Sequence, residues 1–105
     1  MTEFPLPNAS TDLTGRVALV TGASSGFGER FARVLASQGA AVAVAARRID
    51  RLEALAKDIE AAGGRALPVQ MDATDADSLV AAVDAAEQAF GAVDILVNNA
   101  GIPDA

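Results

Sequence analysis

Four short apolar runs alternate with three longer amphipathic stretches, and this alternation constrains the fold more than any other feature of the chain. The runs occupy residues 17–20, 41–45, 66–70 and 94–97. Short apolar runs rich in valine are typical of strands that are buried on both faces. Strands that alternate with helices predict an α/β fold, with a parallel sheet and right-handed crossovers.

The three stretches between the runs have apolar residues at helical spacing. Their predicted core-facing stripes are Phe27, Phe31, Val34 and Leu35, then Leu52, Leu55 and Ile59, and then Leu79, Val83, Ala86 and Phe90. Thr74, with an acidic residue three positions later, predicts the N-cap of the third helix. Pro68 cannot donate to a strand ladder, which predicts that its strand lies at a sheet edge. The expected strand order is 3-2-1-4, with helices on both faces.

The length of 105 residues predicts one domain. Residues 1–15 are predicted to be an irregular lead, because Pro5, Pro7 and Gly15 interrupt any periodic pattern. Residues 16–105 form the predicted domain. The N-terminus does not resemble a signal peptide, and no apolar run reaches the roughly 18 residues of a membrane span. A cytoplasmic location is therefore expected.

The composition excludes several kinds of chemistry. The chain has no His, Cys, Tyr or Trp. It therefore lacks an imidazole base, a thiolate nucleophile, a disulfide and a phenolic acid, and its sequence shows no metal-ligand cluster. The net charge of −6 argues against binding to nucleic acid or to an anionic membrane surface.

The segment Thr21-Gly-Ala-Ser-Ser-Gly-Phe-Gly28 lies between the first predicted strand and the first predicted helix. In an open α/β sheet, ligands bind beyond the carboxyl ends of the strands. A loop there directs backbone N–H groups and the positive end of a helix at a phosphate. The candidate residues are Gly22, Ser24, Ser25, Gly26 and Gly28. The alternative is that the glycines serve only a tight strand–helix turn.

The second predicted strand ends in Ala46-Arg47-Arg48. Sites for NAD usually have an acidic residue there for the ribose 2′-hydroxyl. An arginine instead suits a 2′-phosphate in charge and in bidentate geometry. Arg47 therefore favours NADP over NAD. The alternative is a solvated basic loop in which Arg48 or Arg51 pairs with Asp50 or Glu53.

The fourth predicted strand is followed by Asn98-Asn99-Ala100-Gly101. In the expected strand order this turn lies beside the glycine loop. The two asparagine side chains can bond to backbone groups across the strand ends, and the small residues Ala100 and Gly101 leave room for a flat ligand. Taken alone, the pattern is only a turn.

Together, the glycine loop and the Asn-Asn-Ala-Gly turn resemble the short-chain dehydrogenase/reductase family, and the resemblance extends over nearly the whole chain. It implies a Rossmann-type fold, a nicotinamide cofactor and hydride transfer between an alcohol and a carbonyl. It also implies that Asp72 and Ala73 contact the adenine. Phe27 replaces the usual isoleucine of the glycine loop, where its backbone role is kept. Asn99, Ala100 and Gly101 complete the implied cofactor-binding residues.

The same resemblance implies that the catalytic residues are absent. The family uses a serine and a Tyr-x-x-x-Lys pair that come later in the chain, and no catalytic residue carries over to this sequence. The predicted function is the cofactor-binding half of an NADP-dependent oxidoreductase, inactive alone. When complete, the enzyme is expected to be a homo-oligomer acting on a small alcohol or carbonyl compound. The alternatives are a non-catalytic nucleotide-binding or interaction module and, less favoured, a flavodoxin-like regulator.

Overall fold

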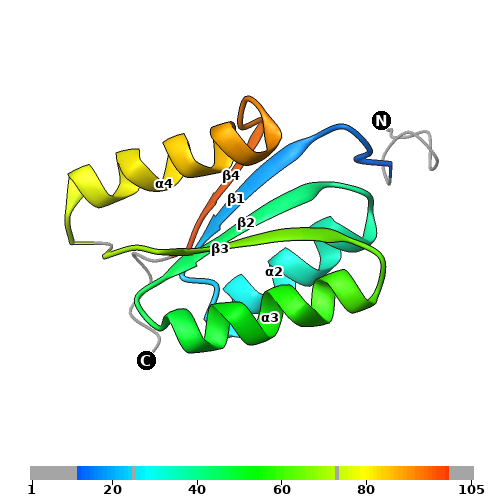
Figure 1. The fold of residues 1–105 in the computed structure, drawn as a ribbon, viewed down its shortest axis with the longest axis horizontal. Coiled ribbons are helices and arrows are strands. Elements are labelled where there is room, and N and C mark those ends of the chain that lie inside the picture. The colour runs from blue at the N-terminus through cyan, green and yellow to red at the C-terminus, as the bar shows by residue number, and fades with distance from the viewer. Residues whose placement is uncertain (1–11, 25, 73, 100–105) are drawn as a thin grey trace, which may run out of the picture.

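Four parallel strands form one sheet in the order β3-β2-β1-β4 (Figure 1). The strands are β1 (Val17–Thr21), β2 (Ala41–Ala46), β3 (Arg65–Gln70) and β4 (Ile95–Asn98). The computed structural model describes residues 12–24, 26–72 and 74–99. The predicted α/β class and strand order are confirmed. The predictions for residues 1–11, Ser25, Ala73 and residues 100–105 lie outside the described residues.

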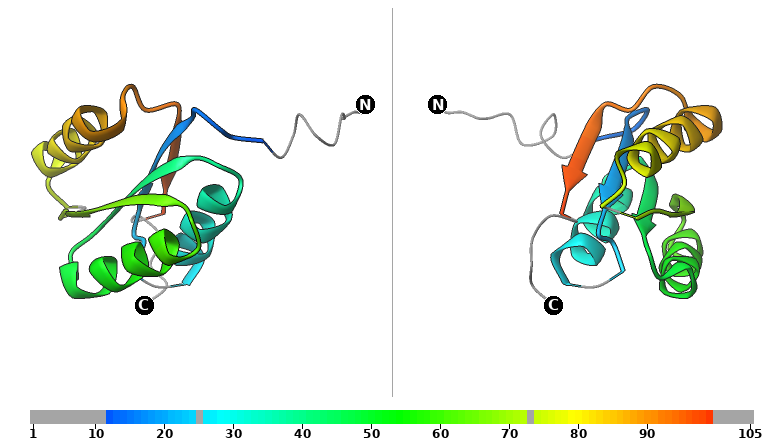
Figure 2. Two further views of the ribbon diagram at one scale, coloured as in Figure 1. Left: turned by 45° about the vertical axis from the view of Figure 1, so that its right-hand side comes forward. Right: turned by 90° about the vertical axis from the view of Figure 1, so that its left-hand side faces the viewer.

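Helices cover both faces of this sheet, as predicted. Helices α2 (Gly26–Ser37) and α3 (Ile49–Ala61) lie together on one face, and α4 (Ala76–Phe90) lies on the other (Figure 2). Successive residues of a strand contribute alternately to two apolar cores, one on each face of the sheet. Val42 and Val44 of β2 contribute to the core under α2 and α3, whereas Ala43 and Ala45 contribute to the core under α4. None of the described helices is long and apolar enough to cross a membrane.

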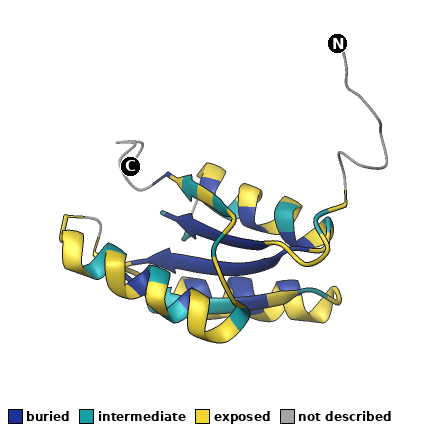
Figure 3. Ribbon diagram, turned by 90° about the horizontal axis from the view of Figure 1, so that it is seen from above, coloured by how far each residue is buried: buried dark blue, intermediate teal, exposed yellow. Residues whose placement is uncertain are grey.

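The central and outer strands differ in burial. Every residue of β1 and β2 is buried, and these strands are dark blue in Figure 3. The strand β3 is an edge, and it contains Pro68 opposite Val44 of β2, which confirms the position expected from the missing N–H. The strand β4 is the other edge, where Leu96 is 53% exposed.

Helix α2 shows a clear departure from the sequence prediction. Phe27, Phe31 and Val34 were expected to face the core, but they are 60%, 45% and 49% exposed. The buried positions are instead Gly28, Ala32 and Ala36, and of the predicted stripe only Leu35 packs against the core. The helix lies so close to the sheet that only the smallest residues fit between them. The prediction from large apolar side chains therefore chose the wrong face.

The other two helices follow their predicted stripes more closely. Leu52, Leu55 and Ile59 of α3 are buried, as expected. In α4, Ala82 and Ala86 are buried, and Leu79 and Val83 pack partly buried against them. Phe90 is only half-buried, and the guanidinium carbon of Arg65 lies 5.5 Å from the centre of its ring.

The N-cap of α4 is one residue later than predicted. Asp75 is the cap, and its Oδ1 accepts a hydrogen bond from the backbone N–H of Asp77 at 3.0 Å. Thr74 instead donates its hydroxyl and its backbone N–H to Asp72. Asp and Thr are both good caps. Because the Thr74 hydroxyl is bonded to Asp72, Asp75 provides the cap.

Candidate functional site

The carboxyl ends of β1 and β4 are joined through one buried hydroxyl group. Thr21 at the end of β1 lies opposite Asn98 at the end of β4. Its hydroxyl donates to Oδ1 of Asn98 at 2.9 Å and accepts the backbone N–H of Asn99 at 3.0 Å. Sequence reasoning missed this role of Thr21. The available signal was a hydroxyl-bearing residue between a buried apolar strand and a glycine loop.

Asn99 ties the end of β4 to the glycine loop. Its side chain is buried, and its Nδ2 donates to the carbonyl oxygen of Gly22 at 3.4 Å. The expected contact of an asparagine side chain with backbone across the strand ends is therefore confirmed for Asn99. Asn98 bonds to the side chain of Thr21 instead. Ala100 and Gly101 lie outside the described residues.

The glycine loop requires glycine at three places, for two physical reasons. Gly22 and Gly26 have φ angles of 66° and 60°, in the left-handed region that side chains disfavour. Gly28 has no such angle, but a Cβ there would collide with the carbonyl group of Gly22. The first turn of α2 therefore lies directly against the end of β1, and its backbone N–H groups begin at the loop.

The remaining loop residues lie on the outside of this contact. Ser24 is half-buried and lines a groove between α2 and α3. Phe27 is exposed at the start of α2. Ser25 lies outside the described residues. A helix N-terminus of this kind, with a glycine loop in front of it, can accept an anion such as a pyrophosphate.

Arg47 and Arg48 follow β2 directly, but they differ in their contacts. Arg48 forms an ion pair with Asp50 at 3.5 Å, so the interpretation of a solvated loop is confirmed for Arg48. The guanidinium of Arg47 is exposed and makes no ion pair with any residue that the structure describes. Its backbone carbonyl accepts a hydrogen bond from Nε2 of Gln70 at 3.1 Å. The backbone is thus held in place while the charge of Arg47 stays available.

Asp72 follows β3 and faces the same end of the sheet. Its Oδ1 accepts the backbone N–H of Thr74 at 2.9 Å and the hydroxyl of Thr74 at 2.7 Å. These hydrogen bonds lower the pKa of the Asp72 carboxyl, and the positive charge of Arg47 lowers this pKa further. Because Ala46 of β2 lies opposite Gln70 of β3, Arg47 and Asp72 follow neighbouring strands at the same end of the sheet. Ala73 lies outside the described residues.

The described candidate residues therefore gather at one end of the sheet. They are Gly22, Ser24, Gly26, Phe27 and Gly28 of the β1–α2 connection, Arg47 after β2, Asp72 after β3 and Asn99 after β4. These residues offer backbone donors, the guanidinium of Arg47, which pairs with no described carboxylate, and one hydrogen-bonded carboxylate, a set suited to holding a phosphorylated ligand. In the three described ranges, no cluster of acidic side chains could hold a metal ion.

Comparison with known proteins gives a consistent result. A sequence model of the short chain dehydrogenase family matches residues 16–105. A short chain dehydrogenase of Pseudocercospora fijiensis is 47% identical over 90 residues, which cover 86% of this chain and 29% of that protein. The cis-4-hydroxycyclohexanecarboxylate dehydrogenase of Sinomonas cyclohexanicum is 47% identical over 89 residues, which cover 85% of this chain and 35% of that protein.

Solved structures agree with the sequence relatives. The crystal structure of a dehydrogenase/reductase from Sinorhizobium meliloti superposes with a TM-score of 0.86 at 43% identity, covering 90% of this chain and 38% of that chain. A short-chain type dehydrogenase/reductase from Mycobacterium marinum gives a TM-score of 0.83 at 44% identity, covering 90% of this chain and 39% of that chain. The chain thus spans less than two fifths of the length of these relatives. It belongs to the short-chain dehydrogenase family.

Proposed function

We propose that residues 16–105 are the dinucleotide-binding part of an oxidoreductase that transfers hydride between NADP(H) and a small alcohol or carbonyl substrate. Family membership implies use of NAD or NADP. The observation that carries the choice of NADP is the exposed guanidinium of Arg47 at the carboxyl end of β2, which forms no ion pair with any described residue. The homo-oligomeric state and the cytoplasmic location stay predictions.

The glycine loop supports binding of the pyrophosphate. The collision that a Cβ at Gly28 would cause shows that backbone groups meet closely at the start of α2. Such a surface lets a phosphate approach N–H groups without interference from side chains. Gly22 and Gly26 hold the loop in the conformation that this approach needs. The bound dinucleotide supplies hydride chemistry, and the residues described here bind and orient it.

The end of β2 supports recognition of a 2′-phosphate. The sequence there is Ala46-Arg47-Arg48, without the acidic residue at the strand end that would bind a free 2′-hydroxyl. Because Arg48 is already paired with Asp50, Arg47 is the stronger candidate to meet the phosphate. Asp72 lies beside it, and we assign the Asp72–Ala73 turn to the adenine. Thr74 occupies Oδ1 of Asp72, which leaves Oδ2 to accept a hydrogen bond from the base.

The test compares Arg47→Ala with Arg48→Ala in the complete protein, using titrations with NADPH and with NADH. Charge-assisted hydrogen bonds contribute about 1.5–3 kcal/mol, so Arg47→Ala is expected to weaken the binding of NADPH about 10- to 150-fold. The affinity for NADH should change little. Arg48→Ala is the matched control, because it removes an adjacent arginine that is already paired, and its effect on NADPH should be smaller.

An equal loss of NADPH and NADH affinity in Arg47→Ala would contradict the 2′-phosphate role. Reduction of NADP by alcohols, or oxidation of NADPH by carbonyl compounds, tests the second half of the proposal. A complete protein that binds NADPH but turns over none of these substrates would instead favour the alternative of a non-catalytic nucleotide-binding module.

A further inference from the structure

A groove of about 300 Å³ runs between α2 and α3 beside the glycine loop. Its polar lining comes from Ser24 of the loop, Glu29 and Arg33 of α2, and Arg51 and Asp58 of α3. The groove thus contains two carboxylates and two guanidinium groups. Which of these charges are already paired decides what the groove can bind.

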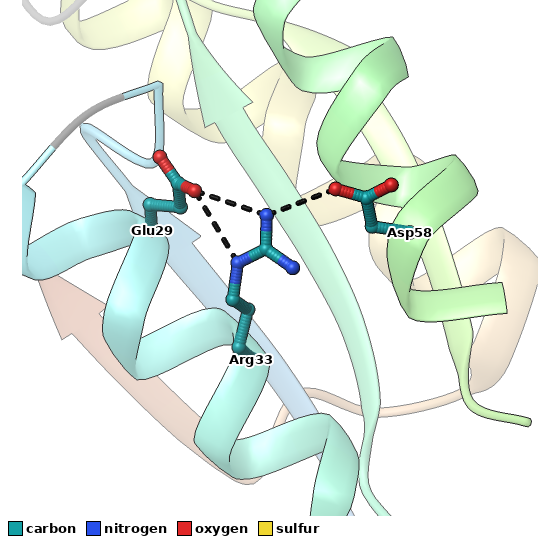
Figure 4. A network of polar contacts seen from close by, with 3 residues as sticks. All are labelled: Glu29, Arg33 and Asp58. Carbon is teal, nitrogen blue, oxygen red and sulfur yellow. Dashed lines mark hydrogen bonds and ion pairs between the residues drawn. The ribbon is translucent and has the colours of Figure 1, made fainter. Parts of the chain in front are cut away.

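Arg33 is already engaged by two carboxylates of the protein (Figure 4). Its Nη2 lies 3.0 Å from Oε2 of Glu29 and 3.0 Å from Oδ2 of Asp58, and its Nε donates to Glu29 at 3.3 Å. The hydrogen bond to Asp58, followed by the one to Glu29, raises the pKa of the Arg33 guanidinium. One arginine therefore bridges both carboxylates of the groove and links α2 to α3.

Arg51 is in a different situation. Its side chain is exposed, and its guanidinium makes no ion pair with any residue in the ranges 12–24, 26–72 and 74–99. Asp50, its neighbour in sequence, is paired with Arg48 instead. The backbone N–H of Arg51 donates to the carbonyl of Arg48 at 3.1 Å, which fixes the first turn of α3 relative to the end of β2. An unpaired cation therefore lines the same groove as Ser24.

We infer that Arg51 is a second specificity-determining residue, which binds the 2′-phosphate of the dinucleotide from the α3 side. This inference rests on the proposed function and adds to it. Arg47 approaches the phosphate from the end of β2, and Ser24 and Arg51 border it along the groove. A phosphate monoester dianion fits because Arg51 is the positive charge of the groove that no described carboxylate engages. Without Arg51 the groove carries a net negative charge, and it repels the ligand.

The test uses the complete protein and two probes, adenosine 2′,5′-bisphosphate and adenosine 5′-monophosphate, which differ only in the 2′-phosphate. The variant Arg51→Gln is expected to weaken the binding of the bisphosphate about five- to tenfold. The effect is modest because solvent partly screens an exposed contact between a charge and a phosphate. The affinity for the monophosphate should stay within about twofold of wild type. Arg51→Lys should recover part of the loss, because it keeps the charge but not the bidentate geometry.

The matched control is Lys57→Gln. Lys57 is an exposed cation on the same helix, and it does not line this groove. Its removal changes the net charge equally, so any general electrostatic effect appears in both variants. The inference would be overturned if Lys57→Gln and Arg51→Gln reduced the affinity for the bisphosphate equally. It would also be overturned if Arg51→Gln reduced the affinity for both probes equally. Thermal unfolding of each variant identifies a loss that comes from misfolding.

The outcomes for Arg47 separate this inference from the proposed function. Suppose that Arg47→Ala reduces the affinity for the bisphosphate more than that for the monophosphate, and that Arg51→Gln does not. The role of Arg51 is then refuted, and the proposed use of NADP stands. If the wild-type protein binds both probes equally, the 2′-phosphate site itself is refuted, and both proposals fail together.

Discussion

The candidate site has two halves that are built in opposite ways. At the ends of β1 and β4, Thr21 and Asn99 are buried, and Gly28 lies in contact with the backbone of Gly22. At the ends of β2 and β3, Arg47 and Asp72 are exposed. The first half consists of backbone groups and buried hydrogen bonds, whereas the second half consists of charged side chains at the surface.

This difference separates two tasks of a dinucleotide site. A pyrophosphate is common to NAD and NADP, and a rigid backbone surface can hold it in either ligand. The 2′-phosphate is what distinguishes the two, and exposed charges can recognise it without disturbing the fold. Substitutions in the buried half should therefore alter stability and the binding of both dinucleotides, whereas substitutions in the exposed half should alter mainly the preference between them.

The largest effect is expected for Gly28→Ala in the buried half. Alanine is usually the better helix former, but the Cβ collides with the Gly22 carbonyl, a backbone group that cannot move away cheaply. The free energy of unfolding should fall by about 2–3 kcal/mol, as in overpacked sites. Affinity for NADH and NADPH should fall together. Urea unfolding and ligand titration of the complete protein measure both effects.

Gly63→Ala is the matched control for that substitution. Gly63 has a φ of 95° and open space around its Cβ position, so alanine there meets backbone strain without a collision. It should cost about 1 kcal/mol and leave both dinucleotide affinities unchanged. A loss of stability in Gly28→Ala no larger than that in Gly63→Ala would show that the contact between helix and strand is not tight.

A middle-sized effect is expected for Thr21→Val. Valine keeps the shape of threonine but leaves the Asn99 N–H and the Asn98 Oδ1 without the hydroxyl that serves both. Asn99 is buried whereas Asn98 is exposed, so the Asn99 N–H is the group that loses its partner away from water. A buried polar group left without a partner costs about 1–3 kcal/mol, so the free energy of unfolding measured with urea should fall by about that amount. Thr21→Ser keeps the hydroxyl and should lose clearly less stability. Equal losses in the two variants would assign the role of Thr21 to packing.

The smallest effect is expected in the exposed half, from the titration of Asp72. Hydrogen bonds from Thr74, and then the charge of Arg47, hold the pKa of the Asp72 carboxyl below its ordinary value. A lowered pKa in the folded state stabilises the protein above the unfolded pKa, and this contribution is lost as the pH falls through the folded pKa. Asp72→Asn should therefore destabilise slightly near neutral pH, and the difference from wild type should shrink in acid.

Urea unfolding at about pH 7 and about pH 3 measures this change in the complete protein. Asp84→Asn is the control, because the Asp84 carboxylate lies exposed on α4 and accepts no hydrogen bond from the described part of the chain. A pH dependence of Asp72→Asn identical to that of Asp84→Asn would show that the Thr74 contacts do not stabilise the folded state. The two halves of the site would then differ in how deeply their residues are buried, and not in how their side chains stabilise the fold.

The sequence anticipated the candidate site better than it anticipated the packing around it. The glycine positions were predictable because a left-handed φ and a close helix–strand contact are local requirements of one loop. The role of Thr21 was not, because its partners lie 76 to 78 residues away in the chain. The different situations of Arg47, Arg48 and Arg51 were likewise hidden, since three nearby arginines look alike until their neighbours are known.

The sequence by itself determined the alternation of strands and helices, the edge position of the strand with Pro68 and the places where glycine is needed. Periodicity, a missing N–H and a restricted φ act over a few residues and do not depend on distant segments. Only the tertiary structure decided that α2 buries Ala32 and Ala36 instead of its phenylalanines, and that Arg33 is paired whereas Arg51 forms no ion pair within the described ranges. Those outcomes depend on how closely a helix approaches a sheet and on which charges meet across two helices.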